Sequence, residues 1–297
     1  MMKRPMLVAI VLLLTAVAAY AAFEDLIASS DDHYEEDRHD QAIADLESAL
    51  SEASGGAQEA EVYWRLARVT LAVGDQQIDN GADTDTILET FTEGEEYGRQ
   101  AIEADSSNHL GYYWTAANVG KWGQTRGIVN SLIKAAPMRD LLAEAIEREP
   151  DHADSYYVLG QLYAQVPGFV SFGNTDYAVS LGRKSVDLER EQVQNDPEEE
   201  FHQDMAIQLA SHLIDRDWNR RKRDREQSGK ADRYREATEL LEKNSYYEGV
   251  VDLPRMSDKE EAERLLRDAV SALRSKRDRS DGEDRNLADA EELLGAL

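Results

Sequence analysis

Residues 153–163, A-D-S-Y-Y-V-L-G-Q-L-Y, constrain the fold more than any other stretch of this chain. An aromatic residue, a leucine, Gly160 and a tyrosine follow the spacing of a helix that packs closely against a neighbour. A glycine at such a crossing lets two backbones approach, while larger side chains fill the seam between successive helix pairs. Upstream, Leu142, Ala145 and Pro150 are typical of the end of a preceding hairpin. The pattern predicts stacked helical hairpins.

Apolar residues recur at helical spacing along most of the chain, and no series of strands is recognisable. The expected helices cover 42–53, 62–73, 87–104, 109–119, 137–148, 155–164, 177–191, 201–214 and 231–243, with an apolar stripe at 262–273. Small residues recur at the expected seams: Ala49, Ala101, Ala145 and Ser185. Their separations exceed the period of about 34 residues in a regular tetratricopeptide repeat. We therefore predict an all-α, tetratricopeptide-like array of helical hairpins with long inter-helix insertions, such as 74–85, and C-terminal capping helices over 258–297.

The N-terminus has the three regions of a secretory signal peptide. Lys3 and Arg4 precede the apolar run 6–19, and Ala19-Tyr20-Ala21 forms a small-x-small cleavage site. We expect cleavage before Ala22, so that 1–21 is the signal and 22–297 the helical domain, with no membrane span after cleavage. An uncleaved anchor is the alternative. The chain has no cysteine, which excludes disulfides and a lipidated N-terminal cysteine. The predicted location is the periplasm or another exported compartment.

Charge limits the classes of partner. The 60 acidic residues outnumber the 33 lysines and arginines, giving a formal net charge of -27. Such a charge repels nucleic acid and anionic lipid, so neither is an expected partner. The acidity also fits a salt-rich habitat. A basic run at 220–225 stands out, and it fits either an acidic partner or an exposed segment that balances nearby carboxylates.

The search for reactive chemistry is negative. The six histidines show no paired metal spacing, and the aspartates at 79, 83 and 85 lack the glycine and the closing glutamate of a calcium loop. The sequence contains neither a phosphate-binding G-x-x-x-x-G-K-[ST] motif nor a G-x-S-x-G elbow. We expect no catalytic residue, no metal and no cofactor, and hence a protein that is not an enzyme.

Two segments rich in aromatic residues and glycine are candidates for a binding site. The first is 112–127, of which 121–127 falls where a hairpin turn is expected, and the second is the irregular loop 166–174. Equivalent loops of stacked repeats lie on one face, so the two segments are expected side by side around an apolar pocket. The alternative is that both loops merely cover the core. The candidate ligand-binding residues are Trp114, Asn118, Trp122, Arg126, Pro167, Phe169 and Phe172.

These segments carry a resemblance to a known family. The patterns Y-Y-W-x-A-A-N-x-G-K-W-G-Q-x-R-G, M-R-D-L-L-x-x-A-I and Y-x-x-L-G-Q-L-Y-x-x-x-P-G, within 97–188, resemble the T component of tripartite ATP-independent periplasmic (TRAP) transporters. The matching positions are Trp114, Asn118, Trp122, Arg126, Pro167 and Gly168. The same region is similar, more weakly, to the regulators of microtubule dynamics, but a secretory signal argues against a cytoskeletal role.

The resemblance implies a non-enzymatic periplasmic scaffold that associates with the substrate-binding protein of a transporter. It also implies assembly into a homo-oligomer and a cleft that takes a hydrophobic small molecule. Members of that family are commonly lipoproteins, and this chain departs from them in having no cysteine. The alternative is a generic envelope scaffold that binds only protein.

Overall fold

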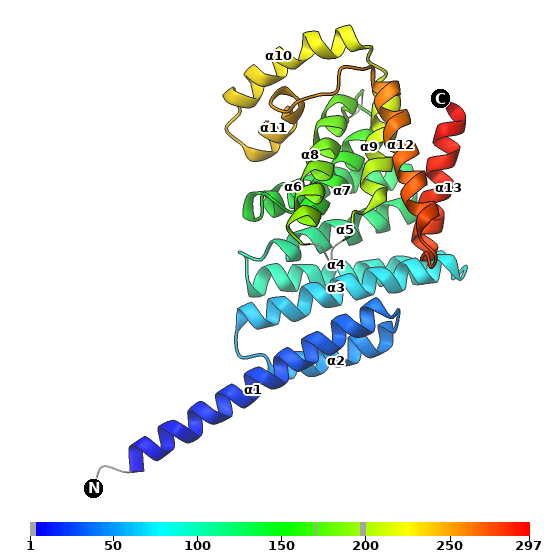
Figure 1. The fold of residues 1–297 in the computed structure, drawn as a ribbon. Helices are drawn as coiled ribbons and strands as arrows, with labels where there is room; N and C mark the ends of the chain where they lie inside the picture. Colours follow the sequence, from blue (N-terminus) through cyan, green and yellow to red (C-terminus); the bar gives the residue numbers. More distant parts are fainter. Residues whose placement is uncertain (1–3, 170, 197–199) are drawn as a thin grey trace. The chain divides into compact units, whose positions relative to one another are not determined.

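The structure, a computed structural model, describes residues 4–169, 171–196 and 200–297. Over these residues it contains helices, turns and bends and no β-strand, which confirms the predicted all-α class (Figure 1). The chain divides into two compact units, one ending at Leu141 and the other beginning at Leu142. Each unit is built from helices that pack against their neighbours in sequence, as expected of a tetratricopeptide-like array.

The first unit begins with two packed helix pairs. Its helices are α1 (Arg4–Glu35), α2 (His39–Glu52), α3 (Gly56–Asp79), α4 (Thr84–Ala104), α5 (His109–Arg126) and the start of α6 (Ile128–Arg148). Helices α1 to α3 share one apolar core, formed by Phe23, Ile27, Ala42, Leu46, Ala49, Val62, Leu66 and Val69. This arrangement follows from the apolar stripe that each helix carries on one face.

Glycines set the distance between α4 and α5. A methyl group added at Gly98 would lie 2.9 Å from the backbone nitrogen of Thr115, and one added at Gly94 would overlap the Asn118 carboxamide. Asn118 is fully buried, and its Nδ2 donates to the carbonyl of Ala67 in α3 at 3.0 Å. Three successive helices are therefore joined at a crossing that admits no larger residue on α4.

The second unit contains an array of helices and a long insertion. The array consists of α7 (Ala153–Gln165), α8 (Thr175–Asn195), α9 (Gln203–Arg216), α12 (Asp258–Ser275) and α13 (Asp281–Ala296). The insertion, residues 217–257, contains α10 (Arg220–Glu236), α11 (Leu240–Asn244) and the 3₁₀ turn η1 (Tyr247–Gly249). The single helix predicted over 231–243 is wrong, because α10 ends at Glu236 and α11 begins only at Leu240. Helices α12 and α13 occupy the segment expected to cap the array.

Two segments expected as irregular are helical. The turn predicted at 121–127 is wrong, because α5 continues through Arg126 and ends at Gly127, whose φ of 91° is left-handed. Packing overrides the low helix propensity of glycine here: a methyl group at Gly120 would lie 2.8 Å from Cε of Met138 in α6. Likewise, the first half of the polar stretch 74–85 extends α3 through Asp79, and its last two residues begin α4.

The predicted seam residues are confirmed. Ala49, Ala101, Ala145 and Ser185 are all fully buried. The expected cleavage point before Ala22 falls inside α1; Lys3 lies outside the described residues, and export of the chain stays a prediction. Among the described residues, none of the helices combines the length and apolar character that crossing a bilayer requires.

Gly98→Ala should destabilise the protein by about 1–3 kcal/mol, because the new methyl group forces α4 away from the α5 backbone. Gly229 offers a matched control with the opposite sign. It lies within α10 in open space, so Gly229→Ala should stabilise by up to about 1 kcal/mol through helix propensity. Urea unfolding of the two variants measures both changes, and equal changes in the two proteins would contradict the close crossing.

Candidate functional site

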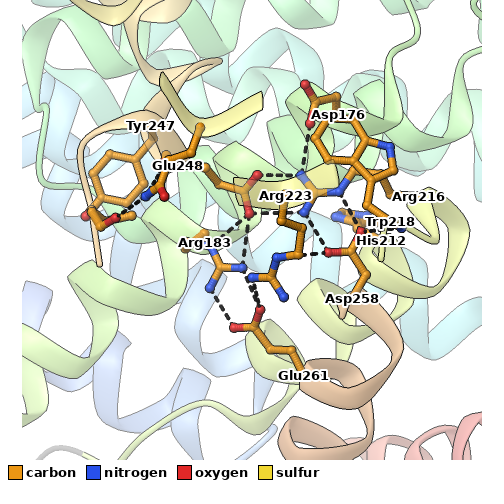
Figure 2. Close-up of polar contacts among 12 residues, drawn as sticks. Asp176, Arg183, His212, Arg216, Trp218, Arg223, Tyr247, Glu248, Asp258 and Glu261 are labelled. Carbon is orange, nitrogen blue, oxygen red and sulfur yellow. Dashed lines mark hydrogen bonds and ion pairs between the residues drawn. The ribbon is translucent and has the colours of Figure 1, made fainter. Parts of the chain in front are cut away.

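The insertion is fixed to the second unit by a buried cluster of charged side chains (Figure 2). Four basic residues, Arg183, Arg216, Arg223 and Lys230, meet four acidic residues, Asp176, Glu248, Asp258 and Glu261. They come from α8, α9, α10, η1 and α12. We call these eight residues the buried ion network. Arg223 and Lys230 belong to it together because a spacing of seven residues places both on one face of α10.

Arg216, in the last turn of α9, lies at the centre of the network. Its guanidinium donates to both oxygens of the Asp258 carboxylate: Nε to Oδ2 at 2.8 Å and Nη2 to Oδ1 at 2.9 Å. Nη1 donates to Asp176 at 2.9 Å and also to Glu248. The two aspartates lie in the first turns of α8 and α12, and Arg216 lies at the C-terminus of α9. The dipole of each helix therefore stabilises the charge at its end.

The remaining cations join α8 and α10 to η1 and α12. Arg183 donates to both oxygens of Glu261, at 2.8 and 3.1 Å, and to Glu248 at 3.1 Å. Arg223 Nη2 donates to Glu261 at 2.5 Å, while Lys230 Nζ donates to Glu248 at 2.7 Å. Glu248 therefore accepts hydrogen bonds from three of the four cations, counting Arg216.

The network is electrically balanced and shielded from water. Glu248 is 1% exposed and Asp258 is fully buried. Burial alone would raise the pKa of Glu248, but Arg216, Lys230 and Arg183 hold that pKa well below its ordinary value. The same carboxylates raise the pKa of the Arg216 guanidinium against the effect of burial. Each of the eight groups lies within ion-pair distance of an oppositely charged member of the network, an arrangement that holds the helices together.

Aromatic rings line the side of this network. The indole of Trp218 lies against the charged groups of Arg216 and Lys222, both 4.4 Å from the ring centroid. Its backbone N–H donates to Asp258 at 2.9 Å. Tyr177 in α8 packs edge-to-face on Tyr246, and their hydroxyls are 2.8 Å apart. These aromatic contacts bury apolar surface between the insertion and the array, and the Tyr177–Tyr246 hydrogen bond links the two directly.

His212 of α9 lies near the crossing of α7 and α8. It is 3% exposed, packs beside Gly160 and Gly182, and its Nδ1 lies 3.3 Å from the Ala178 carbonyl, to which Nδ1–H donates. Burial lowers its pKa to about 4, against the smaller opposing effect of that hydrogen bond. The imidazole is therefore neutral at physiological pH.

The predicted ligand-binding residues of the first unit form a stripe along α5. Trp114, Asn118, Trp122 and Arg126 are four residues apart and share one side of the helix. Asn118 is the buried link to α3 described above, and the Trp114 indole nitrogen is buried without a hydrogen-bond partner among the described residues. Trp122 is half-buried with Lys134 5.1 Å from its ring, and Arg126 is exposed. Asn118 thus has a structural role, whereas ligand binding by the stripe stays a prediction.

The predicted residues of the second unit belong to the turn between α7 and α8. Phe172 packs edge-to-face on Tyr163, with ring centroids 5.3 Å apart, whereas Phe169 is 90% exposed. Pro167 is half-buried, and Val170 lies outside the described residues. The turn is tight, because a methyl group at Gly173 would overlap the Val166 carbonyl. Phe172 thus covers the core. The two sets of candidate residues lie in different units, and their common pocket stays a prediction.

Sequence reasoning missed the buried ion network. The basic run 220–225 reads as surface charge in the sequence, yet Arg223 within it is 3% exposed. One feature of the sequence could have indicated the network. Arg223 and Lys230 are seven residues apart, and acidic residues occupy the first turns of the helices they contact. In the part of the chain that the structure describes, no group of three or more histidines and carboxylates is arranged to hold a metal ion.

The class that the fold defines is a tetratricopeptide-like helical array, and comparison with known proteins adds a partial likeness. A family model described as regulator of microtubule dynamics protein 1-3 matches residues 26–168. Bovine regulator of microtubule dynamics protein 1 is 28% identical over 103 residues, which is 35% of this chain and 32% of that protein. The matched region thus spans about a third of this curated relative's length.

Two solved structures are also similar. A tetratricopeptide protein from Thermus thermophilus has 16% identity and a TM-score of 0.47, covering 77% of this chain and 98% of its own. The pilF protein of Pseudomonas aeruginosa has 15% identity and a TM-score of 0.44, covering 94% and 93%. Both scores are modest, so the description of the fold rests on the helix packing of this chain.

Glu248→Gln should destabilise the protein by about 3–5 kcal/mol, because it removes the charge that neutralises three buried cations. Glu263→Gln is the matched control. Glu263 forms an exposed pair with Arg267, so its loss should change the free energy of unfolding by less than about 1 kcal/mol. Chemical denaturation at pH 7 gives both values. A change at Glu248 as small as that at Glu263 would contradict the tight electrostatic coupling of the network.

His212 should make the protein less stable in mild acid. The unfolded chain binds a proton at this histidine near its ordinary pKa of 6.5, whereas the folded chain resists protonation until about pH 4. Stability should therefore fall by about 2–4 kcal/mol between these pH values from this group alone. His212→Asn, which retains a donor near Nδ1, should remove that slope while lowering stability at every pH. Parallel slopes for the two proteins would contradict the neutral buried imidazole.

Proposed function

We propose that this protein is a non-enzymatic helical-repeat scaffold that binds another protein through the outer face of α10. The supporting observation is how α10 is held. Arg223 and Lys230 fix one face of the helix in the buried ion network, and side chains on the rest of its surface include Arg220, Arg221 and Arg225, all exposed. The helix carries eight basic and four acidic residues in a chain of net charge -27.

Such a helix favours an acidic protein segment as the occupant. Two of the exposed arginines pair with carboxylates of their own helix: Arg220 lies 3.7 Å from Asp224, and Arg225 lies 2.9 Å from Glu226. Exposed pairs of this kind contribute little, so a partner carboxylate exchanges with them readily. Arginine also binds carboxylates through two parallel hydrogen bonds, which gives a rigid arginine-rich face geometric selectivity.

A narrower proposal concerns the partner and the compartment. The charged start and apolar run of the N-terminus support export, and the patterns within 97–188 support association with the substrate-binding protein of a TRAP transporter. On this proposal the α5 stripe and the α7–α8 turn contact a hydrophobic small molecule, and the chain forms a homo-oligomer. A scaffold in the envelope that binds protein alone is the alternative. Mass spectrometry of the mature N-terminus tests export, since a chain beginning at Ala22 is expected.

Microtubule binding is a second candidate function, favoured by the family match over 26–168. Cosedimentation of the full chain with assembled microtubules separates it from the envelope proposals. Sedimentation with microtubules together with an uncleaved N-terminus would favour this candidate. Cleavage before Ala22 and no sedimentation would support a role in the envelope.

The combined substitution Arg220→Glu, Arg221→Glu and Arg225→Glu should weaken binding of the full chain to a hexaglutamate peptide at least tenfold at low salt. The reason is the loss of three exposed positive charges that the network does not need. The control is a matched triple reversal of Arg267, Arg274 and Arg277, which are exposed on or just after α12 and lie outside the buried ion network. Fluorescence anisotropy measures both. Similar losses in the two proteins would mean that net charge, not α10, governs binding.

A further inference from the structure

A separate cavity lies between α7, α9 and α13 in the second unit. Its volume is about 320 Å³, within the range of small-ligand sites. The lining is Tyr157, Gln161, Asp204, Ile207, Gln208, Ser211, Asn286, Asp289, Glu292 and Leu293. It shares no residue with the buried ion network or with the exposed face of α10.

Gln208 is the unusual member of this lining. It is 8% exposed, and neither the oxygen nor the nitrogen of its carboxamide has a hydrogen-bond partner among the described residues. Leaving both halves of a buried amide unpaired is unfavourable, because each group gives up its hydrogen bonds to water without replacing them. Buried polar groups in folded proteins are nearly always paired, so an amide of this kind on a cavity wall points to a partner that enters the cavity.

The charges of the lining are all of one sign. Asp204 on α9 and Asp289 and Glu292 on α13 contribute carboxylates, and the lining contains no lysine or arginine. Burial raises the pKa of Tyr157, and the negative charge of Asp204, to which the tyrosine hydroxyl is hydrogen-bonded, raises it further. Tyr157 is therefore protonated and donates, leaving the other lone pairs of Asp204 available as acceptors. The cavity thus offers several acceptors for a positive group beside an amide that needs both a donor and an acceptor.

α13 closes this cavity loosely. Ala290 is fully buried, while Leu293 is half-buried and Glu292 and Asp289 are exposed. A second cavity of about 700 Å³ lies along the same helix, lined in part by Arg267, Arg274 and Leu294. α13 therefore borders both cavities, and its exposed Asp289 and Glu292 leave the first one open to solvent.

We propose that the cavity between α7, α9 and α13 binds an ammonium or guanidinium group, and that an amide adjoining this group pairs with Gln208. The positive group contacts Asp204, Asp289 and Glu292, where charge-assisted hydrogen bonds are strongest. The amide supplies the donor and acceptor that the Gln208 carboxamide lacks. The cation is either a free organic amine or the side chain of a basic residue in a peptide. Only the peptide carries an amide next to the cation, so the amide distinguishes the two sources.

Isothermal titration of the full chain tests the ligand chemistry. N-acetyl-arginine amide should bind, and N-acetyl-citrulline amide, a neutral molecule of nearly the same shape, should bind at least tenfold more weakly. Agmatine carries the guanidinium without the amide, so binding weaker than that of the arginine compound identifies a peptide side chain as the source. Binding of agmatine as tight as the arginine compound identifies a free amine and removes the role of the Gln208 amide. Equal binding of the citrulline compound, or no binding of any probe, would overturn the proposal.

Substitutions test the site. Gln208→Leu keeps the volume and removes the unpaired amide, so it should raise or maintain the melting temperature while weakening the arginine compound at least tenfold. Asp289→Asn with Glu292→Gln should weaken it similarly, and both residues are exposed enough to leave the fold intact. Glu291→Gln is the control, because Glu291 pairs with Arg274 on the other side of α13. Unchanged binding in the double variant, or the same loss in the control, would disprove the site even if Gln208→Leu fails to fold.

Discussion

The ion pair between Arg216 and Glu248 is the interaction on which the second unit depends. Both side chains are almost completely removed from water, and each is paired again, Arg216 with Asp258 and Glu248 with Arg183 and Lys230. Burying any one of these charges alone would be prohibitive, so the network is favourable only when all its parts are present. It therefore fixes the position of the insertion and of α12 simultaneously. The helix that carries the exposed arginines has no comparable apolar face with which to attach itself.

The helices of the first unit and the attachment of the insertion to the second unit are stabilised by different means. In the first, small residues let α4 and α5 approach until backbone meets side chain, and the fully buried Asn118 links α5 to α3. Such contacts act over short distances and depend on shape. In the second, charged groups with long side chains span the gaps between α8, α9, α10 and α12. Paired charges tolerate these larger separations, which explains how a polar insertion is held on a helical array.

The sequence was sufficient to predict most helices of the array and the seams, but neither α10 nor the site. Apolar spacing located the helical hairpins, and Ala49, Ala101 and Ala145 occupy the buried positions expected of them. The prediction failed at 121–127, because α5 runs past the closely packed Gly120 and ends only at Gly127. Apolar spacing could not predict that Arg223 is buried, because α10 is attached through charges and has no apolar stripe. The acidic partners of α10 come from three separate segments, α8, η1 and α12. Of the predicted binding residues, Asn118 and Phe172 have structural roles that only their neighbours reveal.

The long sequence separation within the ion network has a consequence for the order of folding. Arg183 meets Glu248 and Glu261, which follow it by 65 and 78 residues. During synthesis the arginines of α8, α9 and α10 precede most of their acidic partners, so the second unit cannot complete its interior until nearly the whole chain has emerged. Long-range contacts of this kind slow folding and favour a single late step. The first unit, whose contacts are mostly between neighbouring helices, is free to fold while the remainder is still being made.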